Sequence, residues 1–246
     1  MVKIALLTDL HISSSDEAPM GVFTKDNFLT VLKKAVDSNP DLIVLNGDLC
    51  HKTGEKSVYE QIKTVMDESR IPYTGIPGNH DNAALMHDTF GWDINEETCE
   101  MYYTLNFIDK TFIFLDTSKA KVSESQFEWL KKSIQTIDSK EIVIFMHHPP
   151  IKCDSRHMEP IYAFEDMEIF KALFNDFTDR MFHIFCGHYH MERTVSLNNV
   201  VVYLAPSTFI QIDPEFNHFV KGSDLIGFRQ ILWQADGRIV SNCVYC

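Results

Sequence analysis

Short apolar runs alternate with amphipathic segments along most of this chain. The runs are nearly continuous in hydrophobicity, which is typical of strands that are covered on both faces of a sheet. They occupy residues 3–8, 42–46, 73–77, 111–116, 141–146, 182–186 and 200–204. Alternation of such strands with helices predicts a layered α/β fold with more than one sheet.

Helices are predicted between these strands by apolar stripes and by start signals. A stripe of apolar residues predicts one helix over residues 27–36. Ser57 with Glu60, and Ser123 with Gln126, have the spacing of a capping box. In that motif the serine and the side chain three residues later each accept from the other residue's backbone N–H. Two further helices are therefore predicted to begin at these serines.

Hairpins are predicted toward the end of the chain. The first turns at Asn198 and Asn199 between two apolar stretches, and the second turns at Asp236 and Gly237. These residue types favour such turns because they tolerate the left-handed backbone conformation. No internal repeat, low-complexity tract or linker-like stretch interrupts the chain, so residues 1–246 are expected to form a single domain.

Polar side chains directly follow five of the predicted strands. The carboxyl ends of strands in α/β sheets are where ligands bind, so side chains from remote parts of a chain can converge there. These positions hold Asp9, His11, Asp48, Asn79, His80, Asp81, His147, His148, His188 and His190. We therefore expect them to line one cleft.

The chemistry of these side chains points to metal ions. Carboxylate, imidazole and amide groups without thiolates suit Mn²⁺, Fe²⁺ or Zn²⁺, and the set is large enough for two ions. Two neighbouring divalent ions can share a carboxylate, generate a hydroxide nucleophile at neutral pH and bind the oxygens of a phosphoryl group. Gly47, Gly78 and Gly187 would let the backbone approach such a cluster closely.

Each candidate residue also has an ordinary structural explanation when it is taken alone. Asp9 or Asp48 could cap a helix, and Asn79 could be a turn residue. His188 or His190 could be a hydrogen-bonded core histidine. However, the segments GNHD and GHYH, in this order and at strand ends, are rare by composition. The metal site is therefore the favoured interpretation.

Five short motifs resemble those of the calcineurin-like metallophosphoesterases in type and in order. They are D-x-H at 9–11, GD at 47–48, GNHD at 78–81, a histidine at 147 and GHYH at 187–190. The resemblance implies a four-layer αββα sandwich, in which two mixed β-sheets are flanked by helices. It also leads us to expect that the C-terminal hairpins, about residues 193–246, complete the second sheet.

The resemblance further implies a role for each candidate residue. One metal would be held by Asp9, His11 and His190 and the other by Asn79, His147 and His188, with Asp48 bridging the two. Asn79 and His80 would contact the substrate, and His80, free of metal, would be catalytic. Its imidazole could stabilise the phosphoryl oxygens or protonate the leaving oxygen, because imidazoles exchange protons near neutral pH. Asp81 could lie behind the ligands and orient His80. His148 is expected not to bind metal but to lie behind the ligands or to face the substrate.

Departures from the family's other branches narrow the substrate class. His51 stands where purple acid phosphatases have a tyrosine and protein Ser/Thr phosphatases an aspartate. The segments VVYLAPSTFIQID and IGFRQILWQADGRI resemble those of class III cyclic-nucleotide phosphodiesterases and glycerophosphodiesterases. This resemblance predicts a metal-dependent phosphoric diester hydrolase that uses a metal-bridging hydroxide on small molecules such as cAMP. A phosphomonoesterase or nuclease on the same two metals, or a non-catalytic scaffold, are the alternatives.

Composition and charge restrict partners and location. The chain has 22 Lys and Arg against 35 Asp and Glu, a formal net charge of -13, which disfavours binding to double-stranded nucleic acid. The apolar start before Asp9 is too short for a signal peptide or a membrane span, so we expect a cytoplasmic protein without a membrane partner. The 6 cysteines are expected to be reduced thiols, including the C-x-x-C of Cys243 and Cys246. The sequence leaves a homo-oligomer open.

The long connection at residues 151–180 separates two of the motifs. It is predicted to begin as a loop and to continue as a helix from about Glu165. Arg156, His157 and Tyr162 are candidates for contact with a base or a sugar, because loops beside a site often carry specificity. A surface connection without such a role is the alternative.

Overall fold

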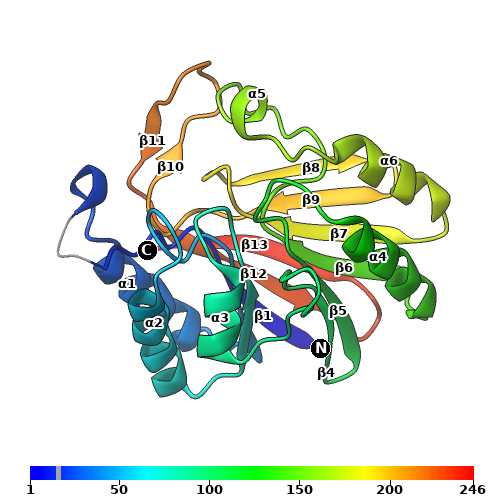
Figure 1. Ribbon diagram of the computed structural model, residues 1–246, viewed down its shortest axis with the longest axis horizontal. Coiled ribbons are helices and arrows are strands. Elements are labelled where there is room, and N and C mark those ends of the chain that lie inside the picture. Colours follow the sequence, from blue (N-terminus) through cyan, green and yellow to red (C-terminus); the bar gives the residue numbers. More distant parts are fainter. Residues whose placement is uncertain (15–17) are drawn as a thin grey trace.

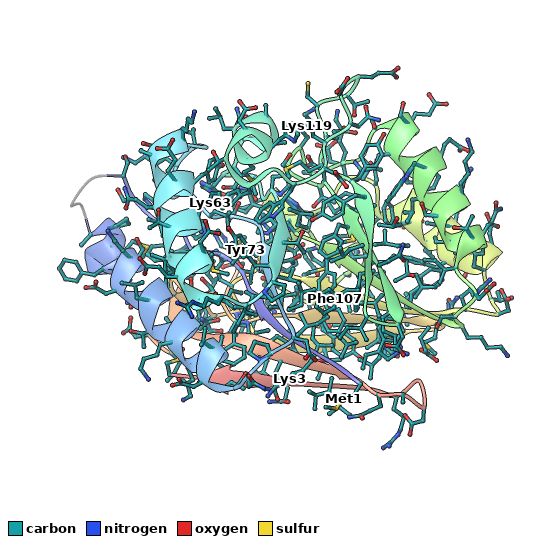
Figure 2. All side chains as sticks on the ribbon, turned by 90° about the horizontal axis from the view of Figure 1, so that it is seen from below. Met1, Lys3, Lys63, Tyr73, Phe107 and Lys119 are labelled. Atoms are coloured by element: carbon teal, nitrogen blue, oxygen red, sulfur yellow. The ribbon has the colours of Figure 1, made fainter. Side chains whose placement is uncertain are left out.

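The computed structural model describes residues 1–14 and 18–246. Two mixed sheets lie face to face, and helices cover the outer face of each (Figure 1). Figure 2, turned by 90°, shows the two helical layers on opposite sides of the molecule. The predicted four-layer αββα sandwich is confirmed.

The first sheet has five strands in the order β13-β12-β1-β2-β3. Neighbours β1, β2 and β3 are parallel, whereas β12 is antiparallel to β1 and to β13. The strands are β1 (Val2–Leu7), β2 (Leu42–Asn46), β3 (Tyr73–Ile76), β12 (Gly227–Trp233) and β13 (Ile239–Tyr245).

The second sheet has six strands in the order β4-β5-β6-β7-β9-β8. Its central strands β5, β6, β7 and β9 are parallel. The strands are β4 (Tyr103–Phe107), β5 (Lys110–Leu115), β6 (Glu141–Met146), β7 (Met181–Cys186), β8 (Arg193–Leu197) and β9 (Val200–Leu204). A separate two-stranded sheet consists of β10 (Gln211–Ile212) and β11 (Lys221–Ser223).

The C-terminal hairpins are divided between the two sheets, so the expectation that residues 193–246 complete the second sheet is wrong for the last hairpin. The β8–β9 hairpin extends the six-stranded sheet, but the β12–β13 hairpin crosses to the other one. There β12 pairs with β1 from Val2↔Trp233 to Leu6↔Arg229. Without β12, the deeply buried β1 would be an edge strand with unpaired backbone groups, which is unfavourable.

Helices cover the outer faces of both sheets. The first sheet packs against α1, α2 and α3, and the second against α4 and α6. Their bounds are α1 (Thr24–Asp37), α2 (Lys56–Ser69), α3 (Ala83–Phe90), α4 (Glu124–Thr136) and α6 (Met167–Asp176). The short α5 (Glu159–Tyr162) and a 3₁₀ turn (Pro19–Gly21) lie in connections. No helix in residues 1–14 and 18–246 is long and apolar enough to cross a membrane.

Strand β1 shows why the predicted runs are continuously apolar. Val2, Ile4 and Leu6 pack in the middle layer between the sheets, while Ala5 and Leu7 pack against the helices. Side chains alternate between the two faces of a strand, so both sets are buried only when both faces are covered. Each large apolar side chain buried in this way contributes about 1.5–3 kcal/mol.

The two predicted helix starts have different outcomes. Ser123 is the N-cap of α4, and its hydroxyl accepts from the Gln126 N–H, as predicted. The Gln126 side chain does not return to Ser123 but bonds both backbone groups of Asp116. The N-cap of helix α2 is Glu55, two residues earlier than the predicted Ser57, and it has no side-chain cap. The capping box at Ser57 is therefore wrong.

Candidate metal centre

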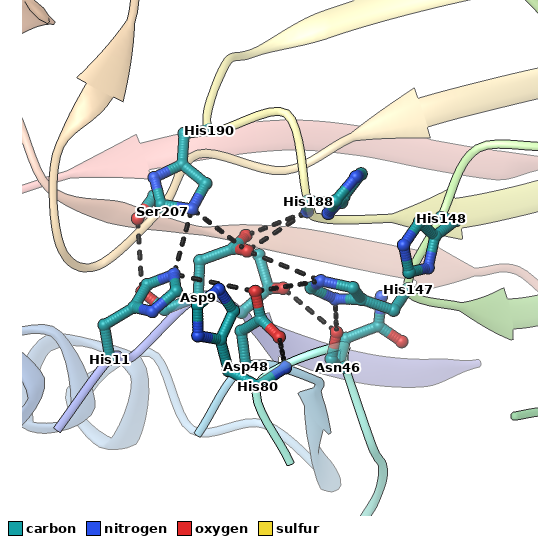
Figure 3. A network of polar contacts seen from close by, with 12 residues as sticks. Asp9, His11, Asn46, Asp48, His80, His147, His148, His188, His190 and Ser207 are labelled. Atoms are coloured by element: carbon teal, nitrogen blue, oxygen red, sulfur yellow. Dashed lines mark hydrogen bonds and ion pairs between the residues drawn. The ribbon is translucent and has the colours of Figure 1, made fainter. Parts of the chain in front are cut away.

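The carboxyl ends of β1, β2, β6 and β7 meet at one end of the sandwich (Figure 3). The loops that follow them bring together six side chains, all of them buried. These are Asp9, His11, Asp48, His147, His188 and His190. Two of the loops come from the first sheet and two from the second, so the site lies where the sheets face each other.

The first group of ligand-type atoms consists of Asp9, His11, Asp48 and His190, all within 4.8 Å of one another. Nε2 of His190 lies 3.0 Å from Nε2 of His11 and 3.3 Å from Oδ1 of Asp9. Nε2 of His11 lies 3.6 Å from Oδ2 of Asp48.

The second group consists of Asp48, His147 and His188, with ligand-type atoms also within 4.8 Å of one another. Nε2 of His147 lies 3.2 Å from Oδ2 of Asp48 and 3.8 Å from Oδ1 of Asp9. Asp48 therefore belongs to both groups, and its carboxylate lies between them.

Backbone carbonyls orient three of the histidine rings. A carbonyl can only accept, so the ring nitrogen bonded to it carries a proton, and the other nitrogen is the one that can bind a metal ion. The acceptors are the carbonyls of Asn46 for His147 Nδ1 at 2.9 Å, Tyr162 for His188 Nε2 at 2.8 Å and Ile210 for His190 Nδ1 at 3.1 Å. For His147 and His190 the nitrogen left free, Nε2, is the one near the carboxylates.

The arrangement fits divalent cations. His147 Nε2 has no hydrogen-bond partner among the described residues, although it lies 3.2 Å from Oδ2 of Asp48. A lone pair and a carboxylate oxygen repel each other at this distance unless a proton or a cation lies between them. Imidazole nitrogens and carboxylate oxygens are the ligands that Mn²⁺, Fe²⁺ and Zn²⁺ accept. The cluster is therefore a dinuclear divalent metal site.

The charges of the metal-free cluster shift several pKa values. Burial alone would lower the pKa of His147, but the charges of Asp48 and Asp9 and the bond to Asn46 outweigh it and raise the pKa to about 9. Burial lowers the pKa of His11 to about 3 and that of His188 to about 4. Without a metal, the cluster therefore holds its compensating proton at His147.

The family model of the calcineurin-like phosphoesterases matches residues 2–192 of the chain. The chain belongs to this family. The predicted enzyme class, a metal-dependent phosphoesterase, is thereby confirmed.

Among sequence relatives, a probable cyclic nucleotide phosphodiesterase of Fibrobacter succinogenes is 33% identical over 233 residues, or 95% of this chain and 90% of that protein. The 3′,5′-cyclic adenosine monophosphate phosphodiesterase CpdA of Escherichia coli K12 is 25% identical, with 98% and 88% coverage. A dimetal phosphatase structure from Danio rerio superposes with a TM-score of 0.67 at 12% identity, covering 99% of this chain and 98% of that one. That last likeness concerns the fold alone.

The backbone of this phosphoesterase is strained at the metal centre. Non-glycine residues at positive φ cost about 1–3 kcal/mol each and persist where surrounding contacts hold them. Five cluster residues have positive φ, namely Asp9 (54°), His11 (45°), Asp48 (53°), His188 (67°) and His190 (48°). The strain is held partly by ladder bonds between loops, such as Asp9 N–H to the Gly47 carbonyl at 3.0 Å.

All three predicted glycines are required by close approach, and a Cβ on Gly47, whose φ is 92°, would lie 2.5 Å from Nδ1 of His147. A Cβ on Gly78 would overlap the Asp48 carboxylate, and one on Gly187 would overlap the Thr8 hydroxyl and lie 2.7 Å from Oδ2 of Asp9. Any side chain at Gly78 or Gly187 would therefore displace a carboxylate of the metal centre.

Asn79 and His80 lie in the turn after β3, on the open side of the cluster. Asn79 is exposed, unlike the six clustered residues, and its predicted roles stay predictions. The backbone N–H of His80 donates to Oδ1 of Asp48 at 2.9 Å. The ring Nδ1 of His80 bonds the Lys52 carbonyl at 3.1 Å. Its ring lies edge-on to that of His11, with centroids 4.9 Å apart.

Asp81 does not orient His80, contrary to the expectation. Its carboxylate accepts from the backbone N–H groups of Gly78, Leu49 and Cys50 and from the Tyr59 hydroxyl. Burial and the charge of Asp48 raise the pKa of Asp81 to about 6. Asp81 therefore holds the loop that carries Asp48, and the Lys52 carbonyl is the group that bonds His80.

His148 is buried beside the second group of ligand-type residues. Its Nδ1 lies 3.1 Å from the Thr117 hydroxyl, and its ring packs against that of His188 at 4.0 Å between centroids. Burial lowers the pKa of His148 well below its usual range, so the ring is neutral.

Several further residues shape the site. Sequence reasoning missed Asn46, although a polar residue ending an apolar strand was a visible signal. Ser207 and Thr208 donate their hydroxyls to the Asp9 carbonyl at 3.1 and 3.2 Å. The carbonyls of Tyr162 and Ile210 had no signal, because every residue has a carbonyl.

The connection at 151–180 contributes an aromatic surface beside the cluster. Helix α5 and the loop of the β10–β11 hairpin lie side by side at the upper edge of Figure 1. The His157 ring lies 6.1 Å from that of Tyr162 and 6.3 Å from that of Phe219. Tyr162 is 49% exposed and Phe219 42% exposed. Arg156 is exposed, and its N–H bonds the Pro214 carbonyl.

Proposed function

We propose that this phosphoesterase hydrolyses small cyclic nucleotides, with cAMP as the first candidate substrate. The observation that carries the proposal is the position of Asp48, whose Oδ2 lies 3.2 Å from Nε2 of His147 and 3.6 Å from Nε2 of His11. A carboxylate between two groups of ligands is what two ions sharing one phosphoester need. In this proposal Asp9, His11 and His190 hold one ion, Asn79, His147 and His188 the other, and Asp48 both.

The class of reaction follows from the family and the relatives. The chain is a metal-dependent phosphoric diester hydrolase. The cyclic-nucleotide substrate rests on relatives that carry that name, at 25–33% identity over at least 95% of this chain. The all-thiol state of the cysteines supports the cytoplasm as the location.

The protein's own groups prepare the site for the reaction. When bound, two divalent ions supply Lewis acidity and a nucleophile at neutral pH, and Mn²⁺, Fe²⁺ and Zn²⁺ all suit these ligands. The backbone N–H of His80 donates to Oδ1 of Asp48, so Oδ2 is the oxygen that would remain for the ions. Asn46 holds His147 with its Nε2 toward that oxygen.

His80 is the proposed catalytic residue. Its Nδ1–H donates to the Lys52 carbonyl, so Nε2 is the nitrogen left to contact substrate. The ring lies beside that of His11. In its imidazolium form, which carries a proton on each nitrogen, His80 can donate the Nε2 proton to the leaving oxygen and becomes neutral. Asn79, exposed in the same turn, is the proposed second contact to the phosphoryl group.

The aromatic surface of His157, Tyr162 and Phe219 supports a substrate with a base. Stacking on exposed aromatic rings is favourable for every nucleobase. Tyr162 belongs to the segment whose carbonyl bonds His188, so this surface adjoins the second group of ligands. A diester without a ring would leave it unused.

Glycerophosphodiesters are the second candidate substrates. A probable glycerophosphodiester phosphodiesterase GpdQ of Arcobacter nitrofigilis is 29% identical over 182 residues, covering 70% of this chain and 65% of that protein. A nuclease is disfavoured by the formal net charge of -13.

The test is a comparison of kcat/KM on four substrates with saturating Mn²⁺: cAMP, glycerophosphocholine, p-nitrophenyl phosphate and single-stranded DNA. We expect cAMP to be preferred by about tenfold or more, a difference of about 1.4 kcal/mol in transition-state binding. Preference for another substrate would replace the proposal with the corresponding activity.

His80→Ala tests the catalytic assignment in the same assay. We expect kcat to fall about 10²–10⁴-fold, because a positioned acid or base contributes that much, while two metal ions still bind. No hydrolysis of any substrate by the metal-loaded protein, with His80→Ala changing nothing, would instead indicate a non-catalytic scaffold.

A further inference from the structure

Asn46 connects the two sheets at the metal centre. It is the last residue of β2, lies two residues before Asp48 and is completely buried. Its side-chain Nδ2 donates to the carbonyl of Met146 at 3.1 Å and to that of Phe185 at 3.3 Å. Met146 ends β6 and Phe185 lies near the end of β7, so both acceptors belong to the other sheet.

The partners of Asn46 are in the segments that carry the metal-site residues. Met146 directly precedes His147, and the strand with Phe185 leads into His188. The backbone carbonyl of Asn46 accepts from Nδ1 of His147 at 2.9 Å and from the hydroxyl of Thr8, which precedes Asp9, at 3.0 Å. This one residue therefore contacts the ends of β1, β6 and β7 while its own strand delivers Asp48.

Stability alone does not call for an amide at this position. Oδ1 of Asn46 is buried without a hydrogen-bond partner among the described residues, which is an energetic cost. An apolar side chain of the same shape would avoid that cost. What only the amide supplies is donation to two carbonyls of the opposite sheet, which fixes how far β6 and β7 lie from β2.

We propose that Asn46 is a positioning residue for the second metal pocket, the one formed by Asp48, His147 and His188. This inference rests on the proposed dinuclear function. The distance of 3.2 Å between Oδ2 of Asp48 and Nε2 of His147 spans the two sheets that the Asn46 amide joins.

The first metal pocket, formed by the first group of ligand-type residues, is held by hydrogen bonds of its own. Loss of the Asn46 side chain is therefore expected to affect the second pocket more than the first. The loops with Asp9 and His11 are bonded to the loop with Asp48 by backbone ladders at 3.0 Å. The Asp9 carbonyl also accepts from the hydroxyls of Ser207 and Thr208. None of these bonds involves the Asn46 side chain.

The test is the Asn46→Leu variant, which keeps the shape of the side chain and removes its donors. Metal-free protein is titrated with Mn²⁺ by calorimetry, and manganese-soaked crystals are measured for anomalous scattering at each pocket. We expect the Kd of the second pocket to rise about 10–100-fold, as is typical when a group that supports a ligand is removed. The first pocket is expected to change by less than about threefold and to keep full anomalous occupancy.

Asn199→Leu is the matched control. The amide Nδ2 of Asn199 also donates only to backbone carbonyls, those of Phe174, Phe177 and Arg180, all outside the metal centre. We expect this variant to lower the melting temperature without changing either Kd. Asn46→Ser, whose hydroxyl retains one donor, gives an intermediate Kd and replaces the leucine variant if that one does not fold.

Two results would overturn the inference. The first is unchanged metal binding in both Asn46→Leu and Asn46→Ser. The second is that the two Asn46 variants and Asn199→Leu all weaken binding at both pockets equally. Failure of the proposed function gives a different result, because the unmodified protein would then bind fewer than two ions or hydrolyse no diester.

Discussion

In the metal centre, buried carboxylates lie close to imidazoles that can carry a positive charge. Asp9 and Asp48 are completely buried carboxylates, and burial alone would raise their pKa values. Imidazoles outweigh this effect and lower both pKa values, those of His190 and His147 for Asp9 and that of His147 above all for Asp48. Metal-free protein must therefore keep positive charge in the cluster, and bound ions would take over that role.

His147 gives the metal-free protein a pH-dependent stability. Its pKa of about 9 in the folded protein exceeds the ordinary 6.5 of the unfolded chain. The stabilisation is fully present below about pH 6.5 and is lost as the pH rises through about 9. We expect the melting temperature of chelator-treated protein to fall by about 5 °C or more between these values. Differential scanning fluorimetry measures it.

His147→Gln serves as the control for this prediction, since an amide does not titrate. A melting temperature that falls equally in the variant and in the unmodified protein would assign the pH dependence to other groups.

At the scale of elements, helix α4 starts with a side-chain cap, whereas helix α2 has none. Ser123 caps α4 through the Gln126 N–H, whereas Ser57 of α2 is exposed and caps nothing. We expect Ser123→Ala to lower the free energy of unfolding by about 1 kcal/mol and Ser57→Ala to leave it within about 0.3 kcal/mol. Urea unfolding of metal-saturated protein measures both. Equal losses in the two variants would contradict the assignment.

Helix α5 and the β10–β11 hairpin together make an element-scale prediction about substrate binding. Tyr162→Ala removes an exposed ring but keeps the backbone carbonyl that bonds His188. We expect the KM for cAMP to rise about tenfold, because stacking of a base contributes about 1–3 kcal/mol. The KM for glycerophosphocholine should stay unchanged. Equal changes for both substrates would mean that the variant disturbs the metal site instead.

At the scale of the whole molecule, the metal centre joins the two sheets. Asp9 and Asp48 come from the first sheet and the clustered histidines 147, 188 and 190 from the second. Ions that bind this arrangement bind only the folded protein, so they stabilise all of it. Mn²⁺ at 100 times its Kd should add about 2.7 kcal/mol, or roughly 5–10 °C in melting temperature.

Calorimetric melting with and without Mn²⁺ checks this prediction, and His190→Ala should reduce the gain because it removes one nitrogen of the first group. Identical melting temperatures under conditions where Mn²⁺ binding is measured would show that the centre does not join the sheets.

Much of the architecture was predictable because it depends on the local periodicity of apolar residues. All seven apolar runs became strands, and both hairpin turns formed at the predicted residues. Strand β4 was missed because its exposed edge positions, such as Thr104, interrupt the apolar pattern. The prediction at Ser57 failed because the position of a cap depends on where the preceding loop allows α2 to begin. That loop is held by hydrogen bonds of Asp81 and Cys50.

The identities of the ligand-type residues and their places after strands were readable from the chain, since side-chain chemistry and strand periodicity are local properties. Folding alone decided which sheet each hairpin joined, which group Asp81 bonds, and that the carbonyls of Asn46, Tyr162 and Ile210 orient the histidines. These outcomes depend on contacts between remote segments and on backbone groups that are the same in every residue. Their positions therefore exist only once the two sheets have packed together.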